Sequence, residues 1–282
     1  MTRPSGDPVL TSTKNPRVRA AADLRDRRER DRTGRSLVDG GRELARALAG
    51  GARVLEVFVD AARLTAEGEA AVEAAGRTGA AIVEVTEPVL DRLAYGDRSE
   101  GVVAVIEIPV LALDSLRLPP EPLVVVLEGV EKPGNLGAVL RSADGAGADA
   151  VIAADPRTDL YNPNTIRASL GTIFTVSLAS GPGPEVRAWL AGAGVRAISA
   201  RVEADLLYTD ADLRGGVAIV LGSEAGGLSD AWAGGESVTV RLPMLGAADS
   251  LNVSIAAGVL LYEARRQRDN DSHQRGSRQR GT

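Results

Sequence analysis

The chain of 282 residues contains no cysteine, and its single histidine, His273, lies in a polar C-terminal stretch. These absences exclude cysteine nucleophiles, Cys/His zinc sites, Ser-His-Asp triads and histidine general bases. Aromatic residues make up only 3% of the chain, so base stacking cannot dominate any nucleic-acid surface. Catalysis therefore has to use Arg, Asp, Glu, Ser, Thr, Asn, Tyr, Lys or backbone groups.

Long apolar runs are also missing. No charged segment followed by an apolar one opens the chain, and no stretch is apolar for long enough to cross a bilayer. We therefore expect a cytoplasmic protein without membrane contact. The net charge of −5 argues against non-specific coating of nucleic acid but allows a local basic face. Nearly all positive charges are arginines, which suit phosphate and base recognition.

The pattern of apolar runs predicts two α/β domains. We expect a small N-terminal domain over residues 1–107, a proline-rich linker over 108–121, a larger domain over 122–266 and a disordered tail over 267–282. The smaller domain should open with one amphipathic helix over 16–32, whose charged run RDRRERDR is typical of a solvated face.

The larger domain alternates short apolar runs with helical segments, which predicts a mainly parallel sheet covered on both faces. The expected strands lie near residues 123–127, 150–153, 175–178, 196–200, 217–221 and 238–242. Three glycine-rich turns follow strands: EGVEKPGNLGAVLR, GSEAGGLS and PMLGAADSLNVS. Because open α/β sheets bind ligands beyond the carboxyl ends of their strands, the three turns point to one site.

The sequence argues against two common nucleotide-binding sites, the dinucleotide fingerprint and the P-loop. The strings GAGADA (145–150) and GAGVRA (192–197) match a loose dinucleotide fingerprint, but each follows a helix and precedes a strand. The fingerprint must instead follow a strand and open a helix. The chain also lacks the GxxxxGK[ST] string of a P-loop, so nucleoside triphosphate chemistry is disfavoured.

The strings NLGAVLR, GSEAGG and LPMLGAADSLNVSIAAG, in this order, resemble the SpoU/TrmH branch of the SPOUT RNA methyltransferases. The opening STKNPRVRAAADL…GRSLVDGGRELARAL resembles the L30e-like RNA-binding domain that often precedes this catalytic domain. The resemblance implies a C-terminal SPOUT domain with a deep trefoil knot, although general topology rules treat knots as rare exceptions. It also implies a homodimer with each active site near the subunit interface.

The resemblance further implies S-adenosylmethionine as cofactor, held by backbone groups of the knot loops, and no metal. Glycines are needed where backbone approaches an adenosine closely, although a tight turn after a strand would also explain them. The expected cofactor-binding residues are Leu221, Gly222, Gly227, Leu242, Met244, Ser250 and Leu251.

The resemblance places Arg141 at the catalytic position of the first motif, as a base or as an electrostatic activator. A guanidinium is permanently charged, so the residue type itself fits holding a phosphate or a developing alkoxide better than removing a proton. Glu224, Ser250 and Asn252 match the other polar positions, where they could orient a ribose hydroxyl. Ser250 would also serve as the cap of the following helix, and Asn135 as a cap and site organiser.

For RNA binding we expect arginines of the N-terminal domain, with Arg35 and Arg42 ahead of the charged run. Arg17 is a further candidate, and Arg167 in NTIRASLG resembles an RNA-contacting or site-supporting residue. The resemblance predicts methylation of a ribose 2′-hydroxyl in structured RNA, with 23S ribosomal RNA favoured. Transfer RNA, methylation of a base nitrogen, a non-catalytic RNA-binding role, and a housekeeping or antibiotic-resistance purpose stay open.

Overall fold

The computed structural model describes residues 8–95, 100–223, 226–234 and 237–279, and it divides the chain into two compact units. The N-terminal unit combines the described residues up to Pro109 with Asp159–Thr175, and the C-terminal unit combines Val110–Thr158 with the residues from Val176 onward. The chain therefore passes between the units three times. The boundaries at 107, 121 and 266 that the sequence suggested stay a prediction.

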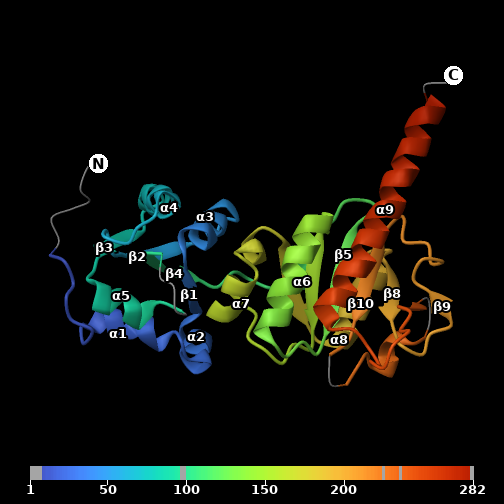
Figure 1. The fold of residues 1–282 in the computed structure, drawn as a ribbon, viewed down its shortest axis with the longest axis horizontal. Coiled ribbons are helices and arrows are strands. Elements are labelled where there is room, and N and C mark those ends of the chain that lie inside the picture. The colour runs from blue at the N-terminus through green and yellow to red at the C-terminus, as the bar shows by residue number, and fades with distance from the viewer. Residues whose placement is uncertain (1–7, 96–99, 224–225, 235–236, 280–282) are drawn as a thin grey trace. The chain divides into compact units, whose positions relative to one another are not determined.

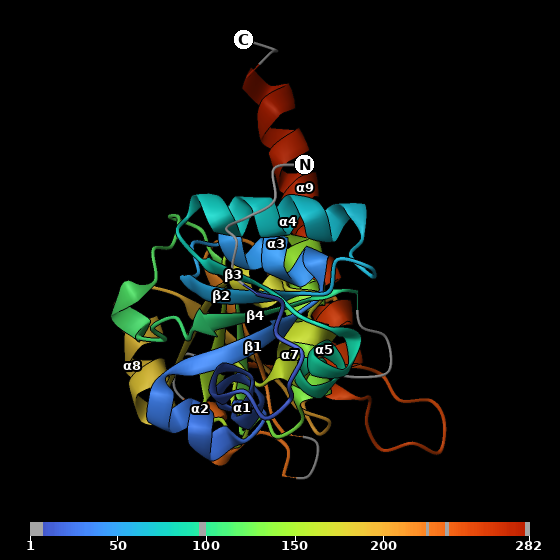
Figure 2. The same ribbon diagram turned by 90° about the vertical axis from the view of Figure 1, so that its left-hand side faces the viewer.

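The N-terminal unit is built on a mixed four-stranded sheet in the order β1-β4-β2-β3, in which β4 is antiparallel to both neighbours. Figure 2 shows α3 and α4 on one face of this sheet and α1 and α5 on the other. The strands are β1 (Arg35–Asp39), β2 (Val54–Val59), β3 (Ala81–Glu84) and β4 (Val102–Glu107). The helices are α1 (Pro16–Asp23), α2 (Arg27–Thr33), α3 (Gly41–Ala49), α4 (Ala66–Arg77), α5 (Glu87–Leu93) and α7 (Pro163–Ala168).

The single helix expected over residues 16–32 is wrong, because the chain forms α1 and α2 with a break between them. Asn15 caps α1 and Asp26 caps α2, each accepting a hydrogen bond from a backbone N–H two residues on, at 2.9 Å. The guanidinium of Arg30 turns back to the carbonyls of Leu24 and Arg25 at 2.8 and 2.9 Å. Side-chain bonds to the backbone thus stabilise a break that helix propensity alone does not reveal.

Arg30 also corrects the view of the charged run as a solvated face. Its side chain is 1% exposed and donates from Nε to Asp159 at 2.5 Å. Asp159 opens the segment Asp159–Thr175, which the N-terminal unit takes from the middle of the sequence. The Ser36 hydroxyl donates to the Tyr161 carbonyl at 2.6 Å, so a second buried bond joins β1 to this segment.

The C-terminal unit contains a seven-stranded sheet in the order β7-β6-β5-β10-β8-β11-β9, and every pairing in it is parallel. The expected mainly parallel sheet is thereby confirmed. Figure 1 shows the central strands β5 and β10 with α6 and α9 beside them. The strands are β5 (Leu123–Glu128), β6 (Ala150–Ala154), β7 (Ser177–Gly181), β8 (Arg196–Ala200), β9 (Leu206–Leu207), β10 (Val217–Leu221) and β11 (Val238–Arg241).

Helices cover both faces of this sheet. The helices α6 (Pro133–Ala146) and α9 (Val253–Gln279) pack against each other, and α9 also contacts β10. On the opposite face, Val186 and Leu190 of α8 (Gly183–Gly192) pack in one cluster with Val124 and Val126 of β5. The continuous apolar sequence of β5 is thus explained by helices that cover both faces of the sheet.

The tail expected to be disordered from residue 267 is helical through Gln279, because α9 does not end where its apolar pattern ends. Gln267 donates to the Ala211 carbonyl at 3.1 Å, and Arg268 donates to the Glu121 and Pro122 carbonyls at 2.8 and 3.0 Å. These bonds tie the polar continuation of α9 to neighbouring loops.

Two glycine strings that mimic a dinucleotide fingerprint lie at helix ends, as their context predicted. Gly147 caps α6 in the left-handed conformation with φ of 67°, and Gly194 follows α8 with the same φ. Across the described residues, no helix is both long and apolar enough to cross a membrane.

Candidate active site

A cavity of about 380 Å³ opens at the carboxyl ends of β8, β10 and β11. It brings together segments from two of the three glycine-rich turns, which lie some twenty residues apart in the sequence. All seven residues expected to bind the cofactor line it: Leu221, Gly222, Gly227, Leu242, Met244, Ser250 and Leu251. Parallel strands end at one edge of the sheet, so the strand pattern already required this convergence.

The loop after β10 closes on itself beside the cavity. Ser223 and Gly227 exchange two backbone hydrogen bonds of 3.1 and 2.9 Å, and Gly227 has φ of 64°, which favours glycine. A Cβ on Gly222 would lie 2.1 Å from the carbonyl carbon of Gly227, so only glycine fits there. Glu224, the expected carboxylate of this loop, lies outside the described residues.

Asn252 and Asn135 connect the third motif to the first. The Asn252 side chain donates from Nδ2 to Oδ1 of Asn135 at 3.3 Å, and its own Oδ1 accepts the N–H of Ser254 at 2.9 Å. Asn252 is therefore the cap of α9, and the expectation of Ser250 in that role is wrong. Asn135 is not a cap either, because α6 begins two residues earlier at Pro133.

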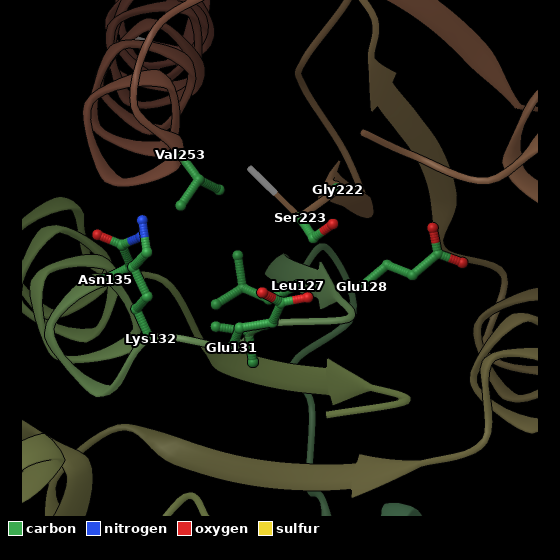
Figure 3. A pocket seen from close by; sticks show the side chains of 9 residues that line it. Leu127, Glu128, Glu131, Lys132, Asn135, Gly222, Ser223 and Val253 are labelled. Atoms are coloured by element: carbon green, nitrogen blue, oxygen red, sulfur yellow. The ribbon is translucent and has the colours of Figure 1, made fainter. Parts of the chain in front are cut away.

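Figure 3 shows a smaller hollow that the first motif contributes, between the start of α6 and the ends of β5 and β10. Its volume of about 20 Å³ suffices for one water molecule. Lys132 and Asn135 enter from the start of α6, Val253 comes from α9, and Ser223 follows β10. Because Gly222, Ser223 and Val253 line both cavities, the first motif adjoins the larger one.

Glu128, the last residue of β5, holds the segment that follows the second motif. Its carboxylate accepts the N–H and hydroxyl of Ser229 at 2.7 and 2.6 Å and the indole N–H of Trp232 at 2.9 Å. Sequence reasoning missed this residue. The available signal was a carboxylate directly at the end of an otherwise apolar strand.

Arg141 is exposed on α6 and lines neither of the two cavities. Its side chain makes no hydrogen bond or ion pair with the part of the chain that the structure describes. The structure thus brings the expected cofactor residues, Asn135 and Asn252 together and leaves Arg141 apart from them within one copy of the chain.

The four arginines expected to bind RNA all belong to the N-terminal unit. Arg17 donates from Nε to Glu56 at 2.7 Å, and Arg42 pairs with Glu43 at 2.8 Å. The side chain of Arg35 is exposed and has no hydrogen-bonding partner among the described residues. Phosphate binding by Arg17 or Arg42 would therefore compete with a carboxylate that each already holds.

Arg167 reaches the carboxylate of Asp39 at 3.3 Å and also donates to the Tyr95 carbonyl. Asp39 has a side chain that is 4% exposed. Burial raises the pKa of Asp39 to about 6, against the opposing effects of a hydrogen bond from the Tyr95 N–H and of the Arg167 charge. Arg167 thus has a supporting role inside the N-terminal unit.

The larger cavity suits S-adenosylmethionine by shape and chemistry. Its volume lies within the range of small-molecule sites, and most of its lining is apolar. Two charged side chains of opposite sign, Arg201 and Asp249, are present among the described lining residues, and the cofactor carries charges of both signs. Neither residue was singled out from the sequence. No group of three or more His, Cys, Asp or Glu side chains suited to a metal ion occurs in the described ranges.

Comparison with known proteins gives two family matches. Residues 122–262 match the SpoU rRNA methylase family, and residues 15–104 match an MRM3-like substrate binding domain. The 23S rRNA (uridine(2479)-2′-O)-methyltransferase of Streptomyces viridochromogenes is 33% identical over 254 residues, which cover 87% of each chain. The 23S rRNA (guanosine-2′-O-)-methyltransferase RlmB of Bordetella pertussis is 36% identical over 229 residues, or 76% of this chain and 90% of the relative.

A solved structure agrees with the sequence matches. The SpoU methyltransferase AviRb from Streptomyces viridochromogenes, in complex with the cofactor AdoMet, superposes with a TM-score of 0.80 at 31% identity and covers 90% of this chain and 98% of its own. The fold, the convergence of the motifs and these similarities lead to one conclusion. The chain belongs to the SpoU rRNA methylase family.

Proposed function

We propose that this protein transfers a methyl group from S-adenosylmethionine to a ribose 2′-hydroxyl of 23S ribosomal RNA. The observation that carries the proposal is the cavity of about 380 Å³. The seven residues expected to bind the cofactor line it, and a hydrogen bond between Asn252 and Asn135 joins the third motif to the first. Two of the similar proteins are 2′-O-methyltransferases of 23S ribosomal RNA.

The cofactor supplies an activated methyl group on sulfur, so no metal is needed for the transfer. In the transfer the oxygen–carbon bond would form as the carbon–sulfur bond breaks, the sulfur would keep that electron pair as a thioether, and the hydroxyl proton would pass to water. Asn135 and Asn252 lie where they can orient an incoming hydroxyl. Arg141 is permanently charged, so we assign it the stabilisation of the developing alkoxide.

Arg141 needs a second copy of the chain to reach an active site. Ile255, Val259 and Tyr262 form an apolar stripe on α9 and are 56%, 36% and 55% exposed. A Cβ on Gly145 of α6 would lie 2.9 Å from the Tyr262 hydroxyl, and Gly145 lies one helical turn from Arg141. The stripe and Arg141 therefore belong to one exposed surface, and we infer a homodimer that buries it.

Oligomeric state tests the dimer directly. The substitutions Ile255→Asp and Tyr262→Asp should convert a dimer to monomers in size-exclusion chromatography with light scattering, because each places a charge in an apolar interface. Val110→Asp is the matched control, since Val110 is 78% exposed outside this surface. A wild-type monomer at micromolar concentration would refute the dimer.

The N-terminal unit supplies RNA binding in this proposal. Its match to a substrate binding domain model supports the assignment. Among the four arginines expected to bind RNA, Arg35 is the one that is exposed and makes no bond to a described carboxylate, so it is the first candidate for a phosphate contact. A ribosomal substrate also places the protein in the cytoplasm.

The test is transfer of radiolabelled methyl from S-adenosylmethionine to ribosomal subunits and, separately, to transfer RNA, followed by nucleoside identification. We expect a 2′-O-methylated nucleoside in 23S ribosomal RNA. Label found only in transfer RNA would show that the proposed substrate is wrong. Label found on a base would show that the proposed reaction is wrong. Binding of cofactor and RNA without transfer would indicate a non-catalytic RNA-binding protein.

The same assay tests Arg141. The variant Arg141→Ala should lose turnover while it keeps its affinity for the cofactor, because Arg141 lies outside the cavity. Turnover at the wild-type rate would exclude its assigned role. A resistance purpose would appear as lower antibiotic sensitivity of a susceptible host that expresses the active protein and not the Arg141→Ala variant.

A further inference from the structure

A third cavity, which we call the α8 cavity, lies on the face of the C-terminal sheet that α8 covers. Its volume is about 250 Å³, roughly two thirds of that of the larger cavity. Residues of α8 and the start of β8 form one side, and Ala231 and Trp232 lie on the other. Arg196, the first residue of β8, lines it, whereas the larger cavity opens at the carboxyl end of the same strand. The α8 cavity is therefore separate from the active site.

The floor of the α8 cavity is apolar and fixed in place. Leu190, Val195 and Trp232 line it and belong to one core cluster on this face of the sheet. The indole N–H of Trp232 donates to the Glu128 carboxylate at 2.9 Å, so the ring is held before any ligand arrives. A floor of this kind can accept a flat, largely apolar group.

Arg187 borders this floor without a carboxylate partner. Its Nη1 donates to the Ala231 carbonyl at 2.6 Å, and its guanidinium lies 5.8 Å from the centroid of the Trp232 ring. Contact with a ring and a carbonyl positions the guanidinium and leaves its charge uncompensated. Four of the five N–H groups of an arginine stay available after one such bond.

Arg196 brings a second positive charge to the same cavity. Its Nη2 donates to the carbonyls of Asp212 and Arg214 at 3.1 and 3.0 Å. The Asp212 carboxylate is bound instead by Nε and Nη2 of Arg214 at 2.8 and 3.0 Å. Among the residues that the structure describes, no Asp or Glu side chain forms an ion pair with Arg187 or Arg196. Two guanidinium groups thus border an apolar cavity without a protein anion between them.

We infer that the α8 cavity binds one unpaired nucleotide of the RNA substrate, with the base on the apolar floor and the phosphate at Arg187 and Arg196. This inference rests on the proposed function, which supplies the RNA. Unpaired bases of structured RNA can turn outward and enter protein cavities, and the planar guanidinium of arginine suits phosphate. An acidic peptide would match the charge as well, but RNA is the anionic polymer that the proposed reaction brings to the protein.

Photo-crosslinking locates the site on the full chain. The probe is a single-stranded hexamer of 4-thiouridine, and the crosslinked peptides are identified by mass spectrometry after protease digestion. We expect crosslinks within residues 187–197 or at Trp232, because these line the α8 cavity. Crosslinks confined to the N-terminal unit would overturn the inference.

Binding as a function of salt tests the two arginines. The variant Arg196→Met should bind a fluorescent uridine hexamer about fivefold more weakly than the wild type. The slope of log affinity against log salt should also become shallower by about 0.7, the value for one lost phosphate contact on a single strand. Arg187→Met should act in the same direction.

Arg117→Met is the matched control. Arg117 is also exposed and donates only to backbone carbonyls, those of Asp114 and Leu116, but it lines none of the three cavities. Its affinity and salt slope should equal those of the wild type. Equal losses in Arg117→Met and Arg196→Met would show a diffuse effect of charge and overturn the site.

A variant that fills the cavity tests whether a base enters it. Ala191 lines the α8 cavity and is exposed, so Ala191→Phe places a ring there without disturbing the core or removing a charge. This variant should bind the uridine hexamer more weakly with an unchanged salt slope. Affinity equal to that of the wild type would mean that no base occupies the cavity, and the inference would fall. An unchanged thermal unfolding curve confirms that each variant is folded.

Two more measurements identify the occupant and separate this inference from the proposed function. A hexaglutamate peptide that displaced the hexamer from the α8 cavity with the same affinity would overturn the assignment to RNA. In the methyl-transfer assay, Arg196→Met and Ala191→Phe should raise KM for ribosomal RNA and leave kcat and cofactor affinity unchanged. An unchanged KM would overturn the α8 site and leave methyl transfer standing, whereas no transfer by the wild-type protein would remove the proposed function itself.

Discussion

The two units of this protein differ in whether they bury charged residues. Among the described residues, every charged residue that is buried belongs to the N-terminal unit: Arg30, Asp39, Glu43 and Asp60. The buried polar residues described in the C-terminal unit are Thr158 and Ser199, which are neutral. One unit is thus held together partly by ion pairs, and the other by apolar strands with glycine loops at their ends.

The difference follows from how each unit is assembled. The C-terminal sheet buries continuous apolar strands on both faces, so local sequence already specifies its core. The N-terminal unit incorporates Asp159–Thr175 from a distant part of the chain, and Arg30 contacts Asp159 across that separation. Breaking a buried pair leaves a charge without compensation, which makes such contacts specific as well as costly to disrupt.

The largest effect should come from removing Arg30. The variant Arg30→Met leaves Asp159 buried without its partner and should lower the free energy of unfolding by about 3–5 kcal/mol, measured by denaturant unfolding followed by circular dichroism. Arg27→Met is the control: its pair with Asp31 is exposed, so the loss should stay below about 1 kcal/mol. Equal losses of unfolding free energy in the two variants would contradict the expected difference between a buried and an exposed ion pair.

A second variant sharpens the same result. Adding Asp159→Leu to Arg30→Met removes the stranded carboxylate and should recover much of the lost stability. No recovery would show that the Arg30 bonds to the Leu24 and Arg25 carbonyls, and not the ion pair, support the unit.

Asp39 should make the stability of the N-terminal unit fall as the pH rises. Its pKa of about 6 lies above the ordinary value of 3.8, so the folded state holds the proton more tightly than the unfolded chain. Stability from this group is complete below about pH 4 and is lost as the pH rises through about 6, by roughly 3 kcal/mol in total.

The measurement is the difference in unfolding free energy between wild type and Asp39→Asn from pH 3.5 to 7. Glu43 and Glu100, whose negative charges help to raise the pKa of Asp39, are present in both proteins, so the difference isolates Asp39. Arg167 and the Tyr95 N–H oppose the shift. A difference that stays flat with pH would contradict the raised pKa.

In the C-terminal unit the sensitive position is a glycine. The variant Gly222→Ala places a Cβ 2.1 Å from the Gly227 carbonyl carbon, so the loop must move and cofactor affinity should fall at least about tenfold. Gly134→Ala serves as the control, because nothing lies within 4 Å of its Cβ. Calorimetric titration with S-adenosylhomocysteine compares them, and similar affinities would mean that the loop is not held by close contact.

The smallest effect should come from the cap of α9. Asn252→Ala removes the bond to the Ser254 N–H and should cost about 1 kcal/mol of stability. Asn252→Asp keeps an acceptor for that N–H but not the donor to Asn135, so it should recover stability and not turnover. Thermal unfolding and the methyl-transfer assay read the two roles separately.

Much of the C-terminal unit was predictable from its sequence. Strand positions and their parallel arrangement follow from apolar runs separated by helical segments, and the glycine-rich turns had to meet at one edge of the sheet. Gly222 and Gly227 were therefore expected at one site, and they line one cavity. Membership in the SpoU family further implies the trefoil knot, which no apolar pattern encodes.

Other features depend on tertiary contacts that could not be predicted from the sequence. Asn252 and not Ser250 caps α9, because a cap requires one particular backbone conformation at the first turn. The polar sequence from residue 267 predicted a disordered tail. In the structure, Gln267 and Arg268 donate hydrogen bonds to loop carbonyls, and the helix continues. Arg201 belongs to no motif, and it lines the larger cavity because it directly follows the end of β8.

The sequence by itself determined the alternation of strands and helices, the order of the motifs and the family, because these are encoded in local composition and spacing. Only the tertiary structure decided that Arg30 is buried, that Asp159–Thr175 joins the N-terminal unit and that Arg201 lines the larger cavity. The physical reason is common to all three. The environment of a charged side chain is set by partners far away in the chain, and its hydration or burial cannot be read from its neighbours in sequence.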